Sequence, residues 1–203
     1  MKENDFYNYV DLLERVLSFS YKERFTFDFV EKTISRSSFF KSIEKQDILP
    51  PQFLSDAQLL KTLFPFEKEL KYNVPVYNQC LWASESYMWI QKKTKLTFEA
   101  IFIFVPLKEM YSKFDLYHEM DFSQIVDYFN EKRKKTSVVD LLFKKFKYSV
   151  KEVAEKTGIP YNTLVSLKNK RRSISGFNVK SLNSLANVFH VRIETIAELE
   201  VEG

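Results

Sequence analysis

Apolar positions in residues 149–172 recur at the spacing of two short helices joined by a tight turn. Ser149 and Glu152 form the S-x-x-E pattern of a capping box, which satisfies free backbone N–H groups where a helix begins. Gly158 follows the first helix, where glycine takes a left-handed backbone without strain. Leu164 and Leu167 predict one buried face of the second helix. The other face carries Tyr161, Asn162, Val165, Ser166 and Asn169, side chains that are small or can form hydrogen bonds.

The flanking sequence repeats the helical pattern on both sides of this motif. Before it, residues 139–146 place apolar side chains at i, i+3, i+4 and i+7. After it, residues 182–189 repeat that spacing, and residues 193–197 predict a shorter last helix. The sequence therefore predicts five helices over about residues 136–199.

One pattern of residues in this C-terminal third is Val153-Ala154, Gly158-Ile159, Thr163-Leu164 and Leu167. In this pattern the segment resembles the helix-turn-helix domain of the Cro/repressor (XRE-like) family, which implies a five-helix DNA-binding domain. Two residues depart from the family pattern. Val150 stands where the family often has a glutamine that meets a DNA phosphate, a contact for which Lys151 could substitute. Lys170 stands where the family often has a glycine after the second helix, which suggests a differently shaped loop.

Positive charge is concentrated on the same part of the chain. The whole chain has a formal charge of +4, but residues 131–180 hold 14 Lys and Arg against 4 Asp and Glu. Residues 1–130 and 181–203 are each net acidic. A basic surface on a helix-turn-helix favours phosphate binding, whereas the alternative is an ordinary solvated lysine face.

Residues 1–130 hold 27 of the 33 aromatic residues and none of the three glycines. Phosphate-binding loops and dinucleotide folds need glycine, and tight hairpins prefer it, so a mostly helical domain is expected. The alternating run at 25–30 indicates a strand or the start of a helix, and we favour the helix. Residues 96–107 indicate a buried helix, with a buried strand as second choice. Further helices are expected at 6–19, 37–45, 55–64, 76–91 and from 121, with breaks at 48–51 and 73–75 and a helical connector at 131–135.

The predicted helix at 76–91 carries an apolar stripe, and Trp82 and Trp89 lie on a neighbouring face. Core packing is the simpler interpretation of this face. The alternative is a dimer surface or a small-ligand pocket walled by tryptophan. The stripe consists of Val76, Cys80, Ala83, Tyr87 and Ile90.

The sequence offers little for catalysis, so we expect no enzyme and no cofactor. The single cysteine, Cys80, cannot form a disulfide or a multi-thiolate metal site within the chain, and burial is expected. His118 and the acids after it lack the second histidine of an H-E-x-x-H zinc helix, and His190 is expected near a helix end. The chain begins without the apolar core of a signal peptide, and its longest apolar run is too short for a bilayer, so a cytoplasmic protein is expected.

These features predict two domains, residues 1–130 for dimerisation or for a protein partner or small ligand, and residues 131–203 for double-stranded DNA. The function expected is a repressor-like, sequence-specific regulator of phage or mobile-element type, acting as a dimer. The alternative is an inhibitor or antitoxin whose N-terminal domain binds a partner protein and whose helix-turn-helix serves only for autoregulation. Tyr161, Asn162, Val165 and Ser166 are expected to read bases, with Asn162 pairing adenine. Phosphate contacts are expected from Lys151, Lys168, Asn169, Lys170, Arg171 and Arg172.

Overall fold

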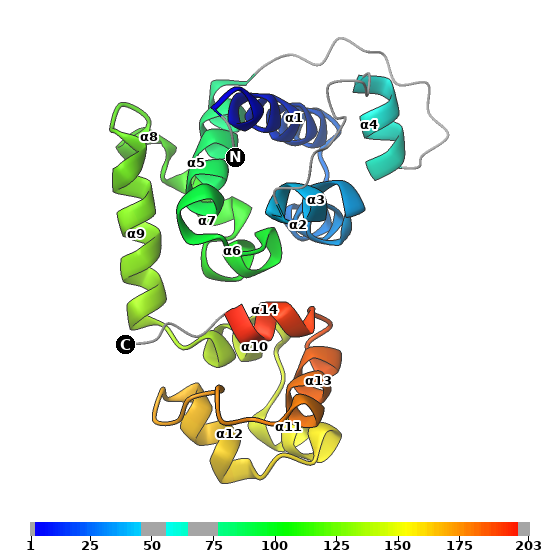
Figure 1. The fold of residues 1–203 in the computed structure, drawn as a ribbon, viewed down its shortest axis with the longest axis vertical. Coiled ribbons are helices and arrows are strands. Elements are labelled where there is room, and N and C mark those ends of the chain that lie inside the picture. The colour runs from blue at the N-terminus through cyan, green and yellow to red at the C-terminus, as the bar shows by residue number, and fades with distance from the viewer. Residues whose placement is uncertain (1–2, 46–55, 65–76, 199–203) are drawn as a thin grey trace. The chain divides into compact units, whose positions relative to one another are not determined.

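The computed structural model describes residues 3–45, 56–64 and 77–198, and all regular structure in these residues is α-helical (Figure 1). The mainly α fold class expected from the sequence is confirmed. The chain divides into two units, residues 1–127 and residues 128–203. The expected breaks at 48–51 and 73–75, and Val76 with them, lie outside the described residues.

The first unit consists of helices joined by short connections. The helices expected at 6–19, 37–45, 55–64 and 76–91 are present, with ends shifted by a few residues. The helix expected at 96–107 is present over residues 98–104, so the strand alternative for this run is wrong, and Pro106 lies before the next helix, which begins at Leu107. The helices of this unit are α1 (Glu3–Lys22), α2 (Phe27–Arg36), α3 (Ser38–Lys45), α4 (Asp56–Leu63), α5 (Asn78–Thr94), α6 (Phe98–Phe104), α7 (Leu107–Ser112) and α8 (Phe114–Tyr117), followed by the start of α9 (Phe122–Lys135).

The alternating run at 25–30 becomes the start of α2. Thr26 caps this helix, since its hydroxyl oxygen accepts the backbone N–H of Phe29 at 3.4 Å. Phe27 and Phe29 remain partly exposed, whereas Val30 and Ile34 are buried. The helical spacing of the buried aliphatic residues therefore determines that this run forms a helix. The alternating aromatic side chains lie at the surface.

The core of the first unit is built mainly between α1 and α5. Leu13, Val16 and Tyr87 are fully buried there, as are the other described members of the expected stripe. Trp82 is buried against the edge of the Phe114 ring. Trp89 packs on Phe6 and on the ring of Phe122, so both tryptophans contact aromatic residues of their own unit.

Two glutamates hold the short helices α6 and α7 at their first turns. Glu31 on α2 is buried, and its carboxylate accepts the backbone N–H of Leu107 at 2.9 Å. Glu44 on α3 accepts the N–H of Phe98 at 2.7 Å. Carboxylates suit helix N-termini because the free N–H groups there carry partial positive charge. These contacts fix α6 and α7 against α2 and α3.

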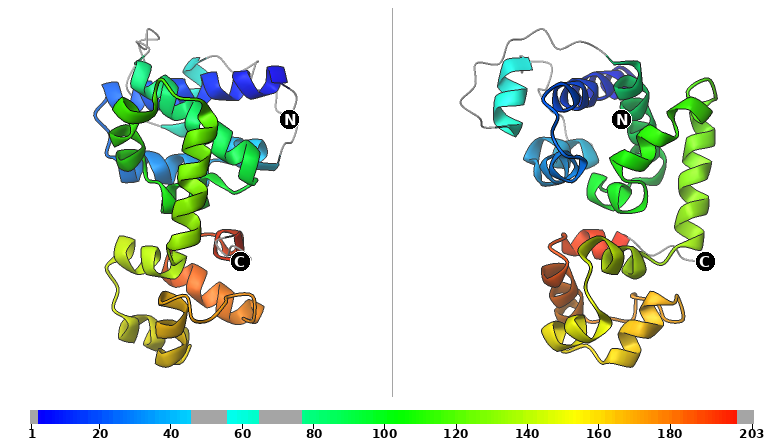
Figure 2. Two further views of the ribbon diagram at one scale, coloured as in Figure 1. Left: turned by 90° about the vertical axis from the view of Figure 1, so that its left-hand side faces the viewer. Right: turned by 180° about the vertical axis from the view of Figure 1, so that it is seen from behind.

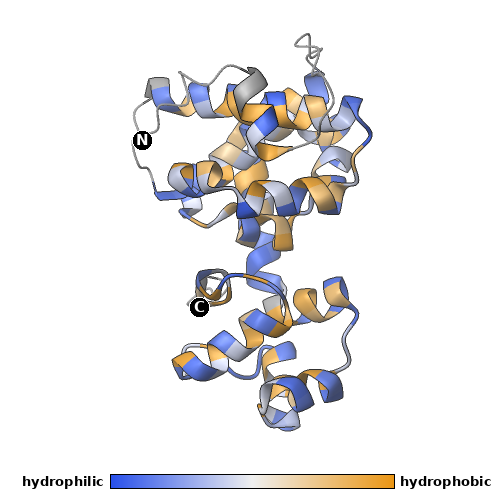
Figure 3. Cartoon of the chain, turned by 90° about the vertical axis from the view of Figure 1, so that its right-hand side faces the viewer, coloured by the Kyte–Doolittle hydropathy of each residue, from blue (hydrophilic) through white to orange (hydrophobic). Residues whose placement is uncertain are grey.

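Helix α9 is continuous to Lys135 (Figure 2). The side chain of Asp121 accepts the N–H of Ser123 at 2.8 Å where the helix begins. Ile125 and Val126 are buried, and the last turns are hydrophilic (Figure 3). The expectation that residues 131–135 form a helical connector is confirmed.

The second unit contains the five helices expected from the sequence. Leu142 and Ile196 lie in the first and last of them, Phe189 caps the end of the fourth, and all three side chains are almost fully buried. The Phe143 and Phe189 rings meet edge to face at 5.4 Å. The helices are α10 (Val138–Phe146), α11 (Val150–Thr157), α12 (Tyr161–Lys168), α13 (Val179–Val188) and α14 (Ile193–Glu198).

Candidate nucleic-acid interface

Helix α11 begins with the capping box expected from its sequence. The Glu152 carboxylate accepts both the backbone N–H and the hydroxyl of Ser149 at 2.7 Å, and the Ser149 oxygen accepts the N–H of Glu152 at 3.2 Å. These donors lower the pKa of Glu152, with the backbone N–H of Ser149 as the main cause. The box fixes the residue at which α11 begins.

The turn between α11 and α12 also follows the expected pattern. Gly158 has a left-handed backbone, with φ 71°, and its N–H donates to Ala154 O at 2.9 Å. Ile159 is buried beneath the turn, and its N–H donates to the Thr157 hydroxyl oxygen at 3.2 Å. Pro160 lies immediately before α12, where its missing N–H leaves no hydrogen bond unmade.

Helix α12 is anchored on one side and open on the other. Leu164 and Leu167 are buried, while Tyr161 is 53% exposed and Asn162 and Asn169 are exposed. The expected base-reading face is completed by residues 165 and 166, which are half-buried. The Ser166 hydroxyl donates to Asn162 O at 2.8 Å, so its oxygen remains available as an acceptor.

The expected phosphate contacts fall into two groups. Lys151, Asn169 and Arg171 are exposed. Arg172 is exposed too, but its guanidinium donates to the Thr163 hydroxyl at 3.4 Å and lies 5.4 Å from the centre of the Phe177 ring. Arg172 is thereby held beside α12.

Lys168 and Lys170, by contrast, have partners within the second unit. The Lys168 amine lies 3.6 Å from the Asp140 carboxylate. The Lys170 amine donates to Lys134 O at 2.5 Å and to Arg133 O at 3.2 Å, both in the last turn of α9. Burial lowers the pKa of Lys170.

Helix α12 ends in a Schellman motif centred on Lys170. The N–H of Lys170 donates to Leu167 O at 3.0 Å, and the N–H of Arg171 donates to Ser166 O at 2.8 Å. Lys170 is left-handed, with φ 54°. The residue that replaces the family's glycine therefore adopts the backbone that glycine favours, at a cost in strain.

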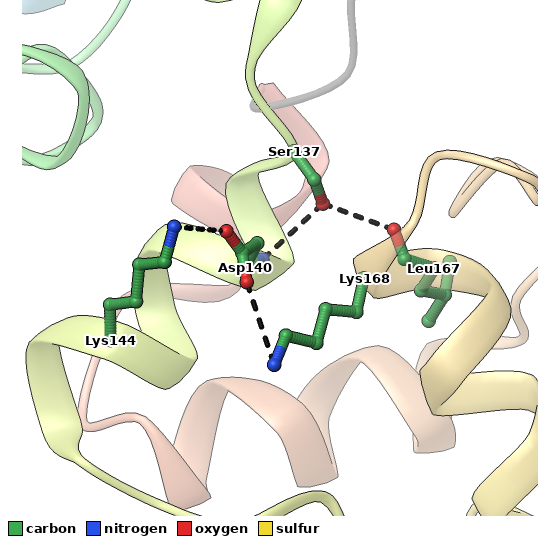
Figure 4. Close-up of polar contacts among 5 residues, drawn as sticks. All are labelled: Ser137, Asp140, Lys144, Leu167 and Lys168. Atoms are coloured by element: carbon green, nitrogen blue, oxygen red, sulfur yellow. Dashed lines mark hydrogen bonds and ion pairs between the residues drawn. The ribbon is translucent and has the colours of Figure 1, made fainter.

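Ser137 and Asp140 are residues that sequence reasoning missed, and both hold the end of α12 (Figure 4). Ser137 caps α10 and donates its hydroxyl proton to Leu167 O at 3.0 Å. Asp140 lies between two lysine amines, 2.7 Å from that of Lys144 and 3.6 Å from that of Lys168. The S-x-x-D spacing before an apolar run could have predicted the cap, but nothing local predicts the bond to Leu167.

A groove of about 510 Å³ lies beside the helix-turn-helix, between the α11–α12 turn and the start of α13. Its charged lining residues are Arg172 and Lys180, and no Asp or Glu among the described residues lines it. Such a groove suits an anion.

The other candidate chemistry from the sequence does not form a site within the described residues. His118 contacts Phe114 O at 2.9 Å through Nδ1 and lies 3.7 Å from the Glu119 carboxylate. No group of three His, Cys, Asp or Glu side chains in the described residues is arranged to hold a metal ion. None of the described helices is long and apolar enough to cross a membrane. Cys80 is buried, and its sulfur lies 3.6 Å from the Tyr111 hydroxyl.

The geometry of α11, the Gly158 turn and α12 defines the second unit as a helix-turn-helix DNA-binding domain. Residues 140–202 match the family model of the Cro/C1-type helix-turn-helix DNA-binding domain, which confirms the resemblance for the C-terminal third and supports a DNA-binding regulator. Comparisons with curated proteins and with solved structures give no match for the chain.

Proposed function

We propose that the chain is a sequence-specific, repressor-like DNA-binding regulator that reads the major groove with α12. The observation that supports this most directly is the division of α12 between buried Leu164 and Leu167 and exposed Tyr161, Asn162 and Asn169. A B-DNA major groove is about 12 Å wide and admits an α-helix whose outer face carries the readout. The anchored face supplies the rigidity that such readout needs.

Base contacts are proposed for the exposed face of α12. The Asn162 amide suits N6 and N7 of adenine, with which it can form two hydrogen bonds. Tyr161 and Val165 offer apolar contact to thymine methyl groups, and the Ser166 oxygen offers an acceptor to a base amine. The preference expected is for A and T at the positions that these side chains meet.

Phosphate contacts are proposed for Lys151, Asn169, Arg171 and Arg172, which flank that face. Lys168 and Lys170 would have to leave Asp140 and the α9 carbonyls to reach a phosphate. We therefore assign these two lysines the role of positioning α12. Phosphate contacts set the register and the affinity, and base contacts set the sequence.

The protein is proposed to act as a dimer on two half-sites. Paired helix-turn-helix domains place their reading helices about 34 Å apart, or one turn of DNA. The test is selection of binding sites from a random DNA pool by the full chain. Two related half-sites with centres about 10 bp apart, bound with an affinity that falls steeply with salt, support the proposal. Selection of a single unpaired site contradicts the dimer, and the absence of any enriched sequence contradicts specific readout.

A second candidate function, binding of a partner protein by the first unit, is favoured by two exposed apolar side chains. Leu116 is 59% exposed and Met120 is 45% exposed, and both lie in the short stretch before α9. A full chain that carries both Asn162→Ala and Arg171→Ala distinguishes the two functions. A variant that loses DNA binding but keeps its biological effect favours the inhibitor or antitoxin, whereas loss of both supports the regulator.

A further inference from the structure

A cavity of about 580 Å³ lies within the first unit, bordered by α1, the α1–α2 loop, α2, Tyr77 and α7. This volume falls in the range of roughly 300–1,000 Å³ that is typical of small-molecule sites. Leu17, Val30 and Leu107 line it and are each almost fully buried. The cavity therefore has an apolar base that is formed by three different helices.

Aromatic rings form much of the remaining wall. Tyr21 and Tyr77 lie with ring centres 4.9 Å apart, and Phe27 and Tyr111 lie 5.5 Å apart. Phe25 completes the set. Tyr21 is 53% exposed and Phe27 is 37% exposed, so two of these rings retain free surface. Flat rings with free faces favour a planar guest that can stack on them.

The charged side chains among the described residues that line this cavity have one sign. Its charged lining residues are Lys22 and Arg24, and no Asp or Glu among the described residues lines it. The nearby end of α1 would disfavour an anion, but its carbonyls are engaged. The backbone N–H of Arg24 donates to Tyr21 O at 3.1 Å, and the backbone N–H of Phe25 donates to Ser20 O at 3.0 Å. The carbonyls of Ser20 and Tyr21 are therefore already bonded, and Arg24 contributes positive charge to the cavity lining.

We propose that this cavity binds a small planar aromatic anion of one or two rings, such as an aromatic carboxylate. The rings would stack between the tyrosine and phenylalanine side chains, above the aliphatic base. The carboxylate would face Arg24, whose planar guanidinium can donate two hydrogen bonds to it. This site is independent of α12 and of DNA binding.

The test uses the full chain and two probes with the same ring system and nearly the same shape, anionic 2-naphthoate and neutral 2-naphthamide, measured by calorimetric titration. Naphthoate is expected to bind one to one and roughly tenfold more tightly, since one charge-assisted hydrogen bond is worth about 1.4 kcal/mol or more. Arg24→Asn should bring naphthoate to the level of naphthamide. Asparagine tolerates the left-handed backbone that Arg24 adopts, with φ 57°, so the fold should persist.

Two further variants separate the cavity from general surface charge. Phe27→Ala should weaken both probes, because it removes a stacking wall. Lys32→Ala, which removes an exposed cation of α2 outside the cavity, should change neither. The proposal is overturned if neither probe saturates, if both probes bind equally to the unmodified chain, or if Lys32→Ala weakens naphthoate as much as Arg24→Asn does.

Discussion

The Ser137 hydroxyl donates to Leu167 O at 3.0 Å and accepts the N–H of Asp140 at 3.3 Å. One side chain thus caps the first turn of α10 and donates to a carbonyl in the last turn of α12, which also accepts the backbone N–H of Lys170. The contact joins residues 30 positions apart in the chain. It fixes the helix proposed to read DNA to the first helix of its own unit.

Replacing Ser137 by alanine should therefore destabilise the second unit by about 1–2 kcal/mol, through loss of a cap and of a partly buried hydrogen bond. Ser137→Thr keeps a hydroxyl and should recover most of this loss. The measurement is hydrogen exchange in α10 and α12. Trp82 and Trp89 both lie in the first unit, so tryptophan fluorescence is the control and should be unaffected. Equal exchange in Ser137→Ala and the unmodified chain would show that the contact contributes nothing.

Gly158 and Gly176 form a matched pair for testing the turn. An added Cβ meets no atom within 4 Å at either residue, but only Gly158 has a left-handed backbone, with φ 71°. Gly158→Ala should cost about 1–2 kcal/mol from backbone strain alone. Gly176→Ala should be neutral or slightly stabilising, because alanine lowers the entropy of the unfolded chain. The free energy of unfolding of the second unit, measured by denaturation, tests both variants. A similar loss of stability at the two positions would rule out backbone strain as the cause.

Lys170 and Arg171 are adjacent cations with different expected roles. Arg171→Ala should make the slope of log K against log salt less negative by about 0.9, as expected when one phosphate contact is lost. Lys170→Asn keeps a residue that tolerates the left-handed backbone and should leave the slope unchanged. It should speed hydrogen exchange in the last turn of α9, where the Lys170 amine now donates. If Lys170→Asn changes the slope of log K against log salt, Lys170 does contact a DNA phosphate.

The Glu152 capping box should make stability depend on pH in acid. The pKa of Glu152 is lowered from 4.5 in the folded chain, so its contribution is complete above the unfolded pKa and is lost as pH falls through the folded pKa. Glu152→Gln should be less stable than the unmodified chain at pH 7, and the difference should vanish at a pH below the folded pKa. Glu155→Gln removes a carboxylate of the same helix outside the box and should have the smaller effect at pH 7. If Glu152→Gln lowers the free energy of unfolding by the same amount at both pH values, the capping box does not make stability depend on the ionisation of Glu152.

The sequence predicted those features whose causes are local. The capping box at Ser149, the turn at Gly158 and the buried face of α12 each depend on residues a few positions apart. The first unit was less predictable because its decisive contacts are distant, as between Glu31 and Leu107, which are 76 positions apart. At the candidate site, local pattern indicated which side of α12 is exposed. Local pattern could not indicate that the Lys170 amine donates hydrogen bonds to the carbonyls of Lys134 and Arg133, 36 and 37 positions earlier.

Base reading by α12 is tested by comparing Asn162→Ala with Asn187→Ala, which removes an exposed amide from α13. Each full-length variant is used to select sites from the same random DNA pool, and affinities are then measured for single base changes in the selected site. We expect Asn162→Ala to lose about 1–3 kcal/mol of discrimination at one base position and Asn187→Ala to lose none. An unchanged site and unchanged discrimination in Asn162→Ala would contradict the claim that α12 reads the bases.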